Sequence, residues 1–501
     1  MRSGRNHPEQ LNRLIREPFR HSARRSCIQQ ILRGHLDMYR LLISIALLLL
    51  LSTPALSKTL YVDGTRGNDN VSYQDNSAEM PWRTIGRAAW GSTNRSSPNP
   101  SEAARAGDTV IIRAGTYSTT GTGVRYDPAY NPANSGTASN PIVFQAEGTV
   151  ILTQTGRGPL IGANGNYGAR DYISWKGFTI NEIDALSTSD TGPVVLWSTT
   201  GSTIEDCVIN GYDNGVNGDN HNGIRLENTT NVVLRNNRIF NVLNFGNVHH
   251  NGAGIMAYFS RGALIENNEI YDSGAGIFVK GGDNRDFTIR NNLLRNNGKG
   301  ILTMYTHPDG EHRIHQNIAI NNGSGISIEL NSKNVSVVNN TLVGNGNGLR
   351  IGWCGDTMSN VRFRNNIIAH SQTEGFSAGE CGSTNPFNID HNIYHNNPRG
   401  WSIAGTRYTS IEAWRAALGG KELSSFTSDP RFQDISTLNY RLQSSSPAFG
   451  AGIDVLDLNN NSITSDAITI GAYITGTESI GLLSGTAPAS APSAPQSLTL
   501  R

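Results

Sequence analysis

Eight copies of one short phrase lie between Ile204 and His391, and most of them contain an Asn pair. The copies read Ile204-Glu-Asp-Cys-Val, Leu234-Arg-Asn-Asn-Arg, Ile265-Glu-Asn-Asn-Glu, Ile289-Arg-Asn-Asn-Leu, Ile314-His-Gln-Asn-Ile, Val337-Val-Asn-Asn-Thr, Phe363-Arg-Asn-Asn-Ile and Ile389-Asp-His-Asn-Ile. A second phrase, a Gly followed by an alternating strand, lies between them and starts every 22 to 31 residues, at Gly223, Gly254, Gly276, Gly300, Gly325 and Gly348. A repeat of this length that carries short strands and no helix is typical of a β-solenoid.

The composition is that of a turn-rich β protein. Among 501 residues, 55 are Gly and only 16% are charged, and the net charge is +1 at pH 7. A charge balance this close to zero predicts no nucleic-acid partner and no general attraction to membrane surfaces. Any preference for an acidic substrate must therefore come from a local group of charges.

An apolar run near the N-terminus predicts export. Residues 40–57 contain a basic residue, a short apolar run and then small residues spaced as in a signal-peptide cleavage site. We expect residues 38–57 to be a signal peptide that starts at Met38, and residues 1–37 to be an extension of the gene model. The alternative is a long basic arm on a membrane anchor, although the run is short for a span. We therefore expect a secreted protein, extracellular or periplasmic, whose mature chain is a monomer without a membrane span.

Residues 58–475 are expected to form one all-β domain. Crossovers between parallel strands are almost always right-handed, so the solenoid should be a right-handed parallel β-helix. Ile85, Ala88 and Ala89 lie at helical spacing, which predicts a short N-terminal helix that caps the first coil. A second helix is expected just before Gly419.

The opening and closing segments resemble those of a known superfamily. Ala106-Gly-Asp-Thr-Val-Ile-Ile-Arg-Ala-Gly-Thr-Tyr and the following Asn140-Pro-Ile-Val-Phe-Gln-Ala resemble the start of secreted β-helix proteins of the pectate-lyase-like superfamily. Ser428-Asp-Pro-Arg-Phe and the strand after it resemble the usual closing segment. The resemblance covers residues 59–475 and implies the fold. Residues 476–501 read as a Gly-, Ala-, Pro- and Ser-rich tail or linker.

Equivalent residues of successive coils should form columns, because parallel strands stack about 4.8 Å apart. The Asn pairs form a column at a turn, where Asn tolerates unusual backbone angles and its amide can bond to the next coil. We interpret this column as architecture. Cys207 takes an Asn position in it, which predicts a buried free thiol. Cys354 and Cys381 each lie six residues after an equivalent Gly, so we predict a disulfide between them.

Alternation along the Gly-led strands separates a core side from an outer face. The residues expected to point inward are Ile224, Leu226, Ile255, Ala257, Ile277, Val279, Ile301, Thr303, Ile326 and Ile328. The residues expected on the outer face are Arg225, Glu227, Met256, Tyr258, Phe278, Lys280, Leu302, Met304, Ser327, Glu329, Arg350 and Gly352. An exposed mixture of apolar and ionisable side chains suggests a binding groove.

Long loops bring further polar side chains to this face. The loop before Gly223 holds Asp213 and Asp219, which are the candidate ligands if Ca²⁺ is a cofactor. The loop before Gly254 holds His249 and His250, which either take part in the chemistry or simply bond to loop backbone. The loop after the strand at Gly300 is expected to supply Tyr305, His307, Asp309 and His312 from the other side.

A groove that binds an acidic sugar needs cations for the carboxylate and a base for the proton beside it. Abstraction of the C5 proton of a uronate, followed by β-elimination, is the reaction of a polysaccharide lyase. The candidate catalytic residues are Lys280, Tyr258, His249 and His250, and the candidate substrate-binding residues are Arg225, Glu227, Phe278, His307, Arg350 and Trp353. The alternative interpretation of Lys280 is a solvated side chain that pairs with Glu227 or Glu329.

Two loose resemblances to enzyme families concern these residues. Lys280 resembles the Lys base of the chondroitinase-B-like and alginate lyase families, because it ends a Gly-led strand and precedes an Ile-x-Asn-Asn phrase. Those families have acidic calcium ligands just before the Lys, where this chain has Ser273 and Ala275. Tyr305-Thr-His-Pro-Asp-Gly resembles the Tyr, Asp, Pro, His phrase of mannuronan C5-epimerases, with the His and the Asp in reversed order about the Pro.

We predict a lyase that acts on a uronate-containing, acidic polysaccharide. The alternatives are a polysaccharide C5-epimerase, a glycoside hydrolase, and a noncatalytic carbohydrate-binding or surface β-helix. Glu227 and Glu329 lie four coils apart, too far for the paired carboxylates of a glycosidase, whereas Asp219 with Glu227 or Asp213 keeps hydrolysis open. We expect the site where the repeat stretches to 31 residues, between Gly223 and Gly254.

Overall fold

The computed structural model describes residues 57–166, 168, 170–181, 192–211, 220–243, 250–354, 357–379, 387–464 and 468–482. The expected gene-model extension, and the expected signal peptide up to residue 56, lie outside these residues. Within the described part of the chain, no helix combines the length and the apolar character that a membrane span needs.

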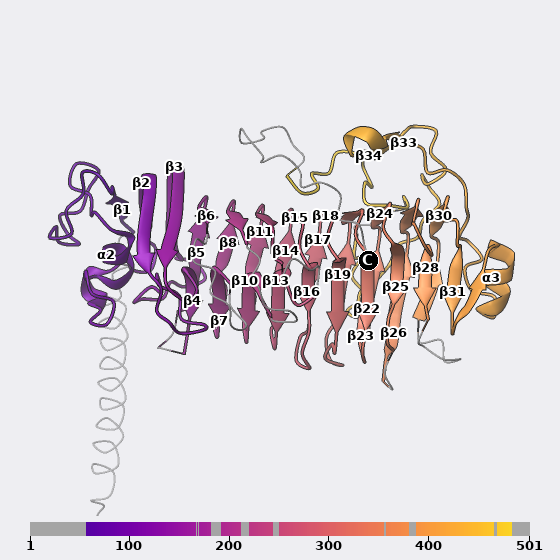
Figure 1. Cartoon of the computed structure of the whole chain (residues 1–501), viewed down its shortest axis with the longest axis horizontal. Coiled ribbons are helices and arrows are strands. Elements are labelled where there is room, and N and C mark those ends of the chain that lie inside the picture. Colours follow the sequence, from indigo (N-terminus) through magenta and orange to yellow (C-terminus); the bar gives the residue numbers. More distant parts are fainter. Residues whose placement is uncertain are drawn as a thin grey trace, which may run out of the picture. The chain divides into compact units, whose positions relative to one another are not determined.

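The strands form a right-handed parallel β-helix, and they follow one another in chain order along the long axis of this unit (Figure 1). A regular coil contributes three short strands, such as β10 (Asn222–Glu227), β11 (Val233–Arg235) and β12 (Arg238–Phe240). Each of them pairs in parallel with the equivalent strand of the coil before and of the coil after. The predicted fold class is confirmed.

One side of the coil is a sheet that counts 11 strands among the described residues. Its members are β4 (Ile161–Asn164), β7 (Val194–Trp197), β10, β13 (Ala253–Tyr258), β16 (Ala275–Val279), β19 (Lys299–Met304), β22 (Ser324–Glu329), β25 (Asn347–Ile351), β28 (Phe376–Ala378), β31 (Trp401–Ile403) and the antiparallel β32 (Thr406–Tyr408). We call the surface of this sheet that faces away from the core the outer face.

The remaining sides form a second sheet, in which the described residues provide 21 strands in two rows. The first row holds β1 (Thr59–Val62), β2 (Thr109–Thr120), β3 (Ile142–Thr155), β5 (Ile173–Lys176), β8 (Thr203–Glu205), β11, β14 (Leu264–Glu266), β17 (Thr288–Arg290), β20 (His312–His315), β23 (Lys333–Val338), β26 (Ser359–Arg364) and β29 (Phe387–Asp390). The second row holds β6 (Thr179–Asn181), β9 (Val208–Asn210), β12, β15 (Glu269–Tyr271), β18 (Leu293–Arg295), β21 (Ile318–Ile320), β24 (Thr341–Val343), β27 (Ile367–Ala369) and β30 (Ile393–His395).

The core runs through the middle of the stacked coils. All of the residues expected to point inward from the Gly-led strands are fully buried, at 0% exposure. They meet the inward residues of the other two strand rows, such as Leu234 and Ile239 of the first regular coil. Since burial of one such aliphatic side chain contributes about 1.5–3 kcal/mol, this continuous apolar column is the main source of stability.

The two Asn residues of each pair have different structural roles. The first Asn of each pair takes a left-handed backbone, with φ of 57° at Asn236 and 55° at Asn267. The second donates from its amide nitrogen to the amide oxygen of the next coil at 3.0 Å each time, through Asn237, Asn268, Asn292, Asn317, Asn340, Asn366 and Asn392. We call this second set the Asn ladder. The interpretation of the pairs as architecture is confirmed.

Cys207 occupies the ladder position of its coil as expected. Its backbone N–H donates to Asn237 Oδ1 at 3.1 Å, and its thiol is free and buried. Burial raises the pKa of this thiol to about 12, so it stays protonated. Cys354 is buried, whereas Cys381 lies outside the described residues, so the disulfide between them stays a prediction.

Both expected helices are present. Helix α2 (Ile85–Trp90) begins after Thr84, whose side chain accepts from Arg87 N, and it covers the first coil with Ile85, Ala88 and Ala89 buried. Helix α3 (Ile411–Ala417) covers the last coil and is followed by Gly419 in a left-handed conformation, with φ of 66°. The other helical segments among the described residues are two short 3₁₀ turns, η1 (Pro100–Glu102) and η2 (Ile435–Thr437).

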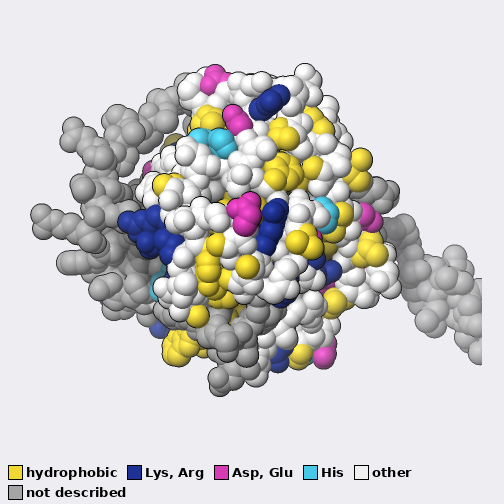
Figure 2. Space-filling model, turned by 90° about the vertical axis from the view of Figure 1, so that its right-hand side faces the viewer, with side chains coloured by type: hydrophobic (Ala, Val, Ile, Leu, Met, Phe, Trp, Pro, Cys, Tyr) yellow, Lys and Arg dark blue, Asp and Glu magenta, His cyan; other side chains and the backbone are white. Residues whose placement is uncertain are grey.

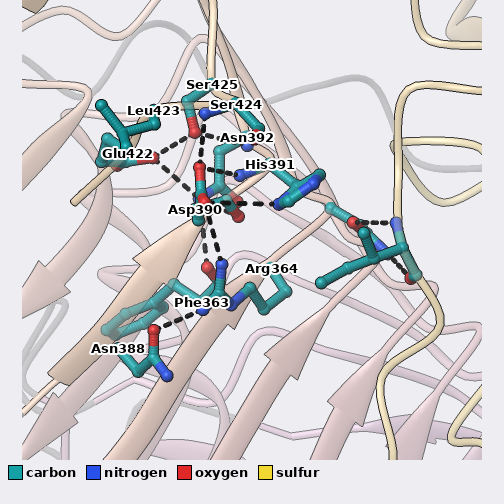
Figure 3. Close-up of polar contacts among 12 residues, drawn as sticks. Phe363, Arg364, Asn388, Asp390, His391, Asn392, Glu422, Leu423, Ser424 and Ser425 are labelled. Atoms are coloured by element: carbon teal, nitrogen blue, oxygen red, sulfur yellow. Dashed lines mark hydrogen bonds and ion pairs between the residues drawn. The ribbon is translucent and has the colours of Figure 1, made fainter.

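The C-terminal end of the Asn ladder is closed by a polar cluster (Figure 3). The backbone N–H of Asn392 donates to Ser425 Oγ at 2.8 Å, and Ser425 is hydrogen-bonded to the buried carboxyl of Glu422. Tyr394 donates to the same carboxyl at 2.6 Å. Seen from this end, the surface has acidic, basic and hydrophobic side chains interspersed (Figure 2), which disfavours the addition of a further strand.

The chain after α3 returns along the second sheet. The antiparallel pair β33 (Phe432–Asp434) and β34 (Asn439–Leu442) and the following segment bury apolar side chains against the row from β18 to β30. Ile480 is 1% exposed in this contact, and Gly481 N donates to Asn291 O at 2.8 Å. The packed chain therefore continues past residue 475, and the part of the expected tail after residue 482 lies outside the described residues.

Candidate functional site

The register of the first sheet confirms the columns expected on its outer face. Arg225 lies opposite Met256, which lies opposite Phe278, and the column continues through Leu302, Ser327 and Arg350. A second column holds Glu227 opposite Tyr258, with Lys280 directly after β16 in the next coil. The Gly-led strands therefore bring the expected side chains together.

The expected exposure of this face is wrong in its middle. Met256 and Leu302 are 0% exposed, Phe278 is 1% exposed and Arg225 is 3% exposed. These apolar side chains stack on their neighbours one coil away and form a small cluster of their own, against which Tyr258 packs. A ligand of this part of the face could therefore reach only its partly exposed edge, where Tyr258 and Lys280 are found.

Lys280 is held by two amides. Its Nζ donates to Asn220 Oδ1 and to Asn251 Oδ1, at 2.9 Å in each case. Each Asn lies two residues before its strand, at the end of one of the two long loops. The Lys280 amine therefore connects residues of three successive coils. The alternative interpretation, a Lys280 that pairs with Glu227 or Glu329, finds no support in the partners of those carboxylates, which bond to Arg225, Lys299 and Arg350.

Tyr258 lies between the two cations of the site. Its hydroxyl donates to Asn220 Oδ1 at 3.3 Å, so Tyr258 and Lys280 share one amide oxygen. Lys280 Nζ is 5.2 Å from the centre of the Tyr258 ring, and the Arg225 guanidinium is 4.2 Å from it. Arg225 in turn donates to Glu227 Oε2 at 2.7 Å and to Asn222 Oδ1 at 3.2 Å. Arg225 is therefore a buried group that fixes the Tyr258 ring.

His250 contributes an aromatic contact. Its ring meets the edge of Phe278 with 5.6 Å between centres, and Lys280 Nζ lies 4.8 Å from the centre of the same Phe278 ring. His249, Asp213 and Asp219 lie outside the described residues. In the described chain, no three His, Cys, Asp or Glu side chains come together as metal ligands, so Ca²⁺ binding by Asp213 and Asp219 stays a prediction.

An aromatic pair closes the site on its N-terminal side. Tyr126 belongs to the long loop between β2 and β3, and its ring meets Trp197 edge-on with 4.0 Å between centres. The Arg225 guanidinium is 5.6 Å from the Tyr126 ring. Trp197 lies opposite Glu227 in the register. This loop is therefore a wall of the site.

A second charged group lies on the same face towards the C-terminus. Lys299 Nζ is 2.7 Å from Glu329 Oε1, and Arg350 Nη1 is 3.2 Å from the same oxygen. Glu329 is 7% exposed. Trp353 lies beyond this group and is 63% exposed, which makes it the most exposed of the predicted substrate-binding residues placed by the structure.

The histidines after β19 are not at the site. His307 lies near Asp283 and Asp309, at 4.0 Å and 3.8 Å, beyond the turn that ends the outer face. His312 was expected beside it but belongs to β20, where its ring packs on Phe287 and its Nδ1 accepts from Phe287 N at 3.3 Å. Burial lowers the pKa of His312 to about 3. The expected position of His312 on the groove is wrong, because a new strand begins at that residue.

Four further residues of the site escaped the sequence analysis: Asn220, Asn251, Tyr126 and Trp197. The two Asn residues are the penultimate residues before the strands that follow the long loops, so the last turn of each loop was the signal available. Trp197 could have been found by extending the column of Glu227 and Tyr258 one coil towards the N-terminus. Tyr126 gave no such signal, since it lies in a loop outside the repeat.

The comparisons with known proteins agree with this architecture. The family model described as "Right handed beta helix region" matches residues 173–342. This chain is a right-handed parallel β-helix protein. The fold that the sequence analysis predicted is thereby confirmed.

Individual proteins resemble the chain at low sequence identity. The uncharacterized protein YwoF of Bacillus subtilis is 25% identical over 464 residues, which cover 78% of this chain and 92% of YwoF. XylC, solved in complex with xylose, is 14% identical with a TM-score of 0.49, over 72% of this chain and 79% of XylC. The pectate lyase Pel9A is 15% identical with a TM-score of 0.46, over 83% of this chain and 96% of Pel9A.

Proposed function

We propose that the protein is a secreted polysaccharide lyase that cleaves a uronate-containing polysaccharide by β-elimination, with Lys280 as the base. The observation that carries the proposal is the pair of amide oxygens, from Asn220 and Asn251, that hold Lys280 Nζ at 2.9 Å each. These two contacts fix the position of Nζ at the partly exposed edge of the outer face, and a general base must be positioned in this way.

The proposed reaction needs two proton transfers. The Lys280 lone pair takes the C5 proton of a bound uronate, the C5–H electrons form the C4–C5 double bond, and the C4–O bond breaks. The Tyr258 hydroxyl gives its proton to the departing oxygen. Tyr258 is suited to this role because its ring is fixed by the Arg225 guanidinium at 4.2 Å and lies beside Lys280.

The same base also suits a C5-epimerase. Such an enzyme takes the same first proton and returns one to the opposite side of C5, with the glycosidic bond kept. Tyr258 and Lys280 bond to the same Asn220 amide oxygen and so lie on one side of the sugar, and an epimerase would therefore need a proton donor on the other side. The paired carboxylates that a hydrolase needs lie about 5–9.5 Å apart, whereas Glu227 and Glu329 are four coils apart.

The test uses two lysines of the outer face as a matched pair. Wild type, Lys280→Ala and Lys299→Ala are incubated with polymers of mannuronate, guluronate, galacturonate and glucuronate, with and without a chelator, and absorbance of the unsaturated product is followed. We expect Lys280→Ala to lose about 10²- to 10⁴-fold in kcat and Lys299→Ala to stay close to wild type. A chelator effect would support a Ca²⁺ site at Asp213 and Asp219.

Other outcomes would overturn the proposal. Solvent deuterium at C5 without chain cleavage would identify an epimerase, and new reducing ends without absorbance would identify a hydrolase. Binding of the polymers without any reaction would leave a noncatalytic β-helix. Secretion is tested separately, by the N-terminal residue of the exported protein, which should lie at or near residue 58.

A further inference from the structure

A row of exposed apolar side chains lines the turn that ends the outer face. The turn position directly after this face holds Ser198, Asn228, Phe259, Gly281, Tyr305, Leu330 and Trp353 in successive coils. Phe259, Tyr305 and Trp353 are 45%, 40% and 63% exposed. We call these three residues the aromatic ridge. It starts in the coil of Tyr258 and passes directly beside Lys280.

The ridge replaces a polar arrangement found in the preceding coils. Asn228 donates to Ser198 Oγ at 3.2 Å, and Ser198 donates to Asn166 Oδ1 at 3.2 Å, so the turn there is stabilised from coil to coil. From Phe259 onward the same position has neither Asn nor Ser, and three of its five residues are exposed aromatic side chains. Nothing in the fold requires this change, because Asn is the residue that this kind of turn favours.

A large aromatic residue in place of Asn at this turn strains the backbone. Phe259 has φ of 48° and Tyr305 has φ of 55°, in the left-handed region that bulky residues rarely adopt. In this conformation Cβ lies too close to the following carbonyl oxygen, so each such residue is unfavourable. An exposed side chain regains little of this free energy through packing. Strain that stability does not explain is common where a ligand is held.

The spacing of the ridge is regular. Phe259, Tyr305 and Trp353 follow each other at every second coil, about 9.6 Å apart for coils stacked at about 4.8 Å. The coil between the first two has Gly281, where an added Cβ would lie within ordinary contact distance of Phe259 Cε1, at 3.7 Å, and closer to Tyr258 Cδ1, at 3.2 Å. The coil between the last two has Leu330, which is partly buried against the cluster of the outer face.

The geometry points to a subsite row for an extended polysaccharide that lies parallel to the axis of the β-helix, with a sugar face stacked on each ring of the ridge. In an extended 1,4-linked chain each sugar is turned over relative to the one before, so the same face returns at every second sugar. One ring for every second coil matches that two-sugar repeat. The inference rests on the proposed function for the identity of the sugar as a uronate, since Lys280 directly precedes Gly281, in the column next to the ridge.

The inference predicts how affinity depends on chain length. The ridge spans four coil steps, about 19 Å, so oligosaccharides should bind more tightly as they lengthen until they reach Trp353 from Phe259. A disaccharide contacts one ring at most. Affinity is measured by calorimetry with a di- to octasaccharide series of the uronate polymer that binds wild type, using the Lys280→Ala variant to prevent turnover.

Substitutions in the ridge give the decisive test. We expect Phe259→Ala, Tyr305→Ala and Trp353→Ala each to weaken polymer binding roughly three- to tenfold. Tyr305→Phe keeps the ring and should bind as wild type does. Phe449→Ala is the matched control, because Phe449 is also 45% exposed but belongs to the C-terminal segment. Disaccharide affinity should change for one ridge variant at most.

Phe259→Asn separates binding from folding. Asn relieves the left-handed strain, so this variant should unfold at a higher temperature than wild type and yet bind polymer more weakly. The ridge proposal is overturned if all three Ala variants bind the polymer as wild type does, or if they lose equal affinity for disaccharide and polymer. The proposed function still stands in that case, provided that wild type cleaves the polymer. If the ridge variants lose polymer binding but wild type cleaves no polymer, the ridge proposal stands and the proposed function is overturned.

Discussion

Lys280 and Lys299 lie on the outer face of adjacent coils and have different partners. Lys280 Nζ donates to two Asn amide oxygens, at 2.9 Å each. Lys299 Nζ is 2.7 Å from the carboxylate of Glu329, which Arg350 approaches at 3.2 Å. A carboxylate shared by two cations joins coils, whereas the two amide oxygens position the Lys280 amine at the edge of the face. The comparison teaches that two lysines on one face can differ in their acceptors, and this difference is why we propose Lys280, and not Lys299, as the base.

The strongest way to break this difference is to give Lys280 an acceptor like that of Lys299. In Asn251→Asp a carboxylate would stand 2.9 Å from Lys280 Nζ and would raise the pKa of the amine, so less of it would be neutral at a given pH. We expect kcat/KM at neutral pH to fall by about 10²-fold or more, and its rise with pH to move to higher pH. The measurement is a pH–rate profile on the polymer that wild type cleaves.

Asn228→Asp is the control for that variant, since Asn228 lies one coil away at an exposed turn and bonds to Ser198. An unchanged profile in Asn251→Asp would mean that Lys280 is not the base.

The second prediction concerns the coil that contains Lys299. Burial lowers the pKa of His312 on β20 to about 3, well below its unfolded value of about 6.5. The unfolded chain therefore binds the extra proton first, so stability is complete above about pH 6.5 and falls towards pH 3. His312 alone should lower the free energy of unfolding by about 2 kcal/mol between pH 7 and pH 5.

Urea unfolding at several pH values checks this effect, and His312→Asn, which keeps an acceptor for Phe287 N, should flatten the curve. His315 also has a pKa lowered by burial, to about 4, so part of the dependence should remain. Amide exchange should show β19–β21 loosening in acid before β13–β15. Equal loosening of both regions would mean that these histidines do not control acid stability.

The third prediction removes the carboxylate from the Lys299 region. Glu329→Gln leaves Lys299 and Arg350 close together without their shared anion, and it should lower the free energy of unfolding by about 1–2 kcal/mol. Cleavage should stay within a few-fold of wild type, because this group only joins coils. Thermal unfolding and kcat, measured on the same sample, show whether Glu329 affects stability alone or also activity. A loss of activity as large as that of Lys280→Ala would erase the distinction between the two lysines.

The fold could be predicted from the sequence because it repeats. Each inward residue from Ile224 to Ile328 follows from one alternation rule, and each ladder Asn has the same place in its phrase. Even the single departure, Cys207, was interpretable, because a buried thiol fits where the ladder begins. Repetition provides many copies of one local signal, so an error in a single coil does not change the result.

The site could be predicted only in part, because it depends on what does not repeat. The columns gave Tyr258 and Lys280 but could not show that Phe278 and Met256 bury each other on the outer face. Asn220 and Asn251 look like many other Asn residues of this chain until three coils are stacked. His312 was misplaced because a loop length does not show where the next strand begins.

The Asn ladder gives the molecule a direction as well as a register. Every ladder amide donates towards the C-terminus, from Asn237 through to Asn392, so the amide dipoles add head to tail, as peptide dipoles do in a helix. Their positive end points at the carboxyl of Glu422, 3.5 Å from Asn392 Nδ2. Burial raises the pKa of this carboxyl. A coil placed in reverse would oppose its neighbours' dipoles, so the β-helix can be extended by new coils in one orientation only.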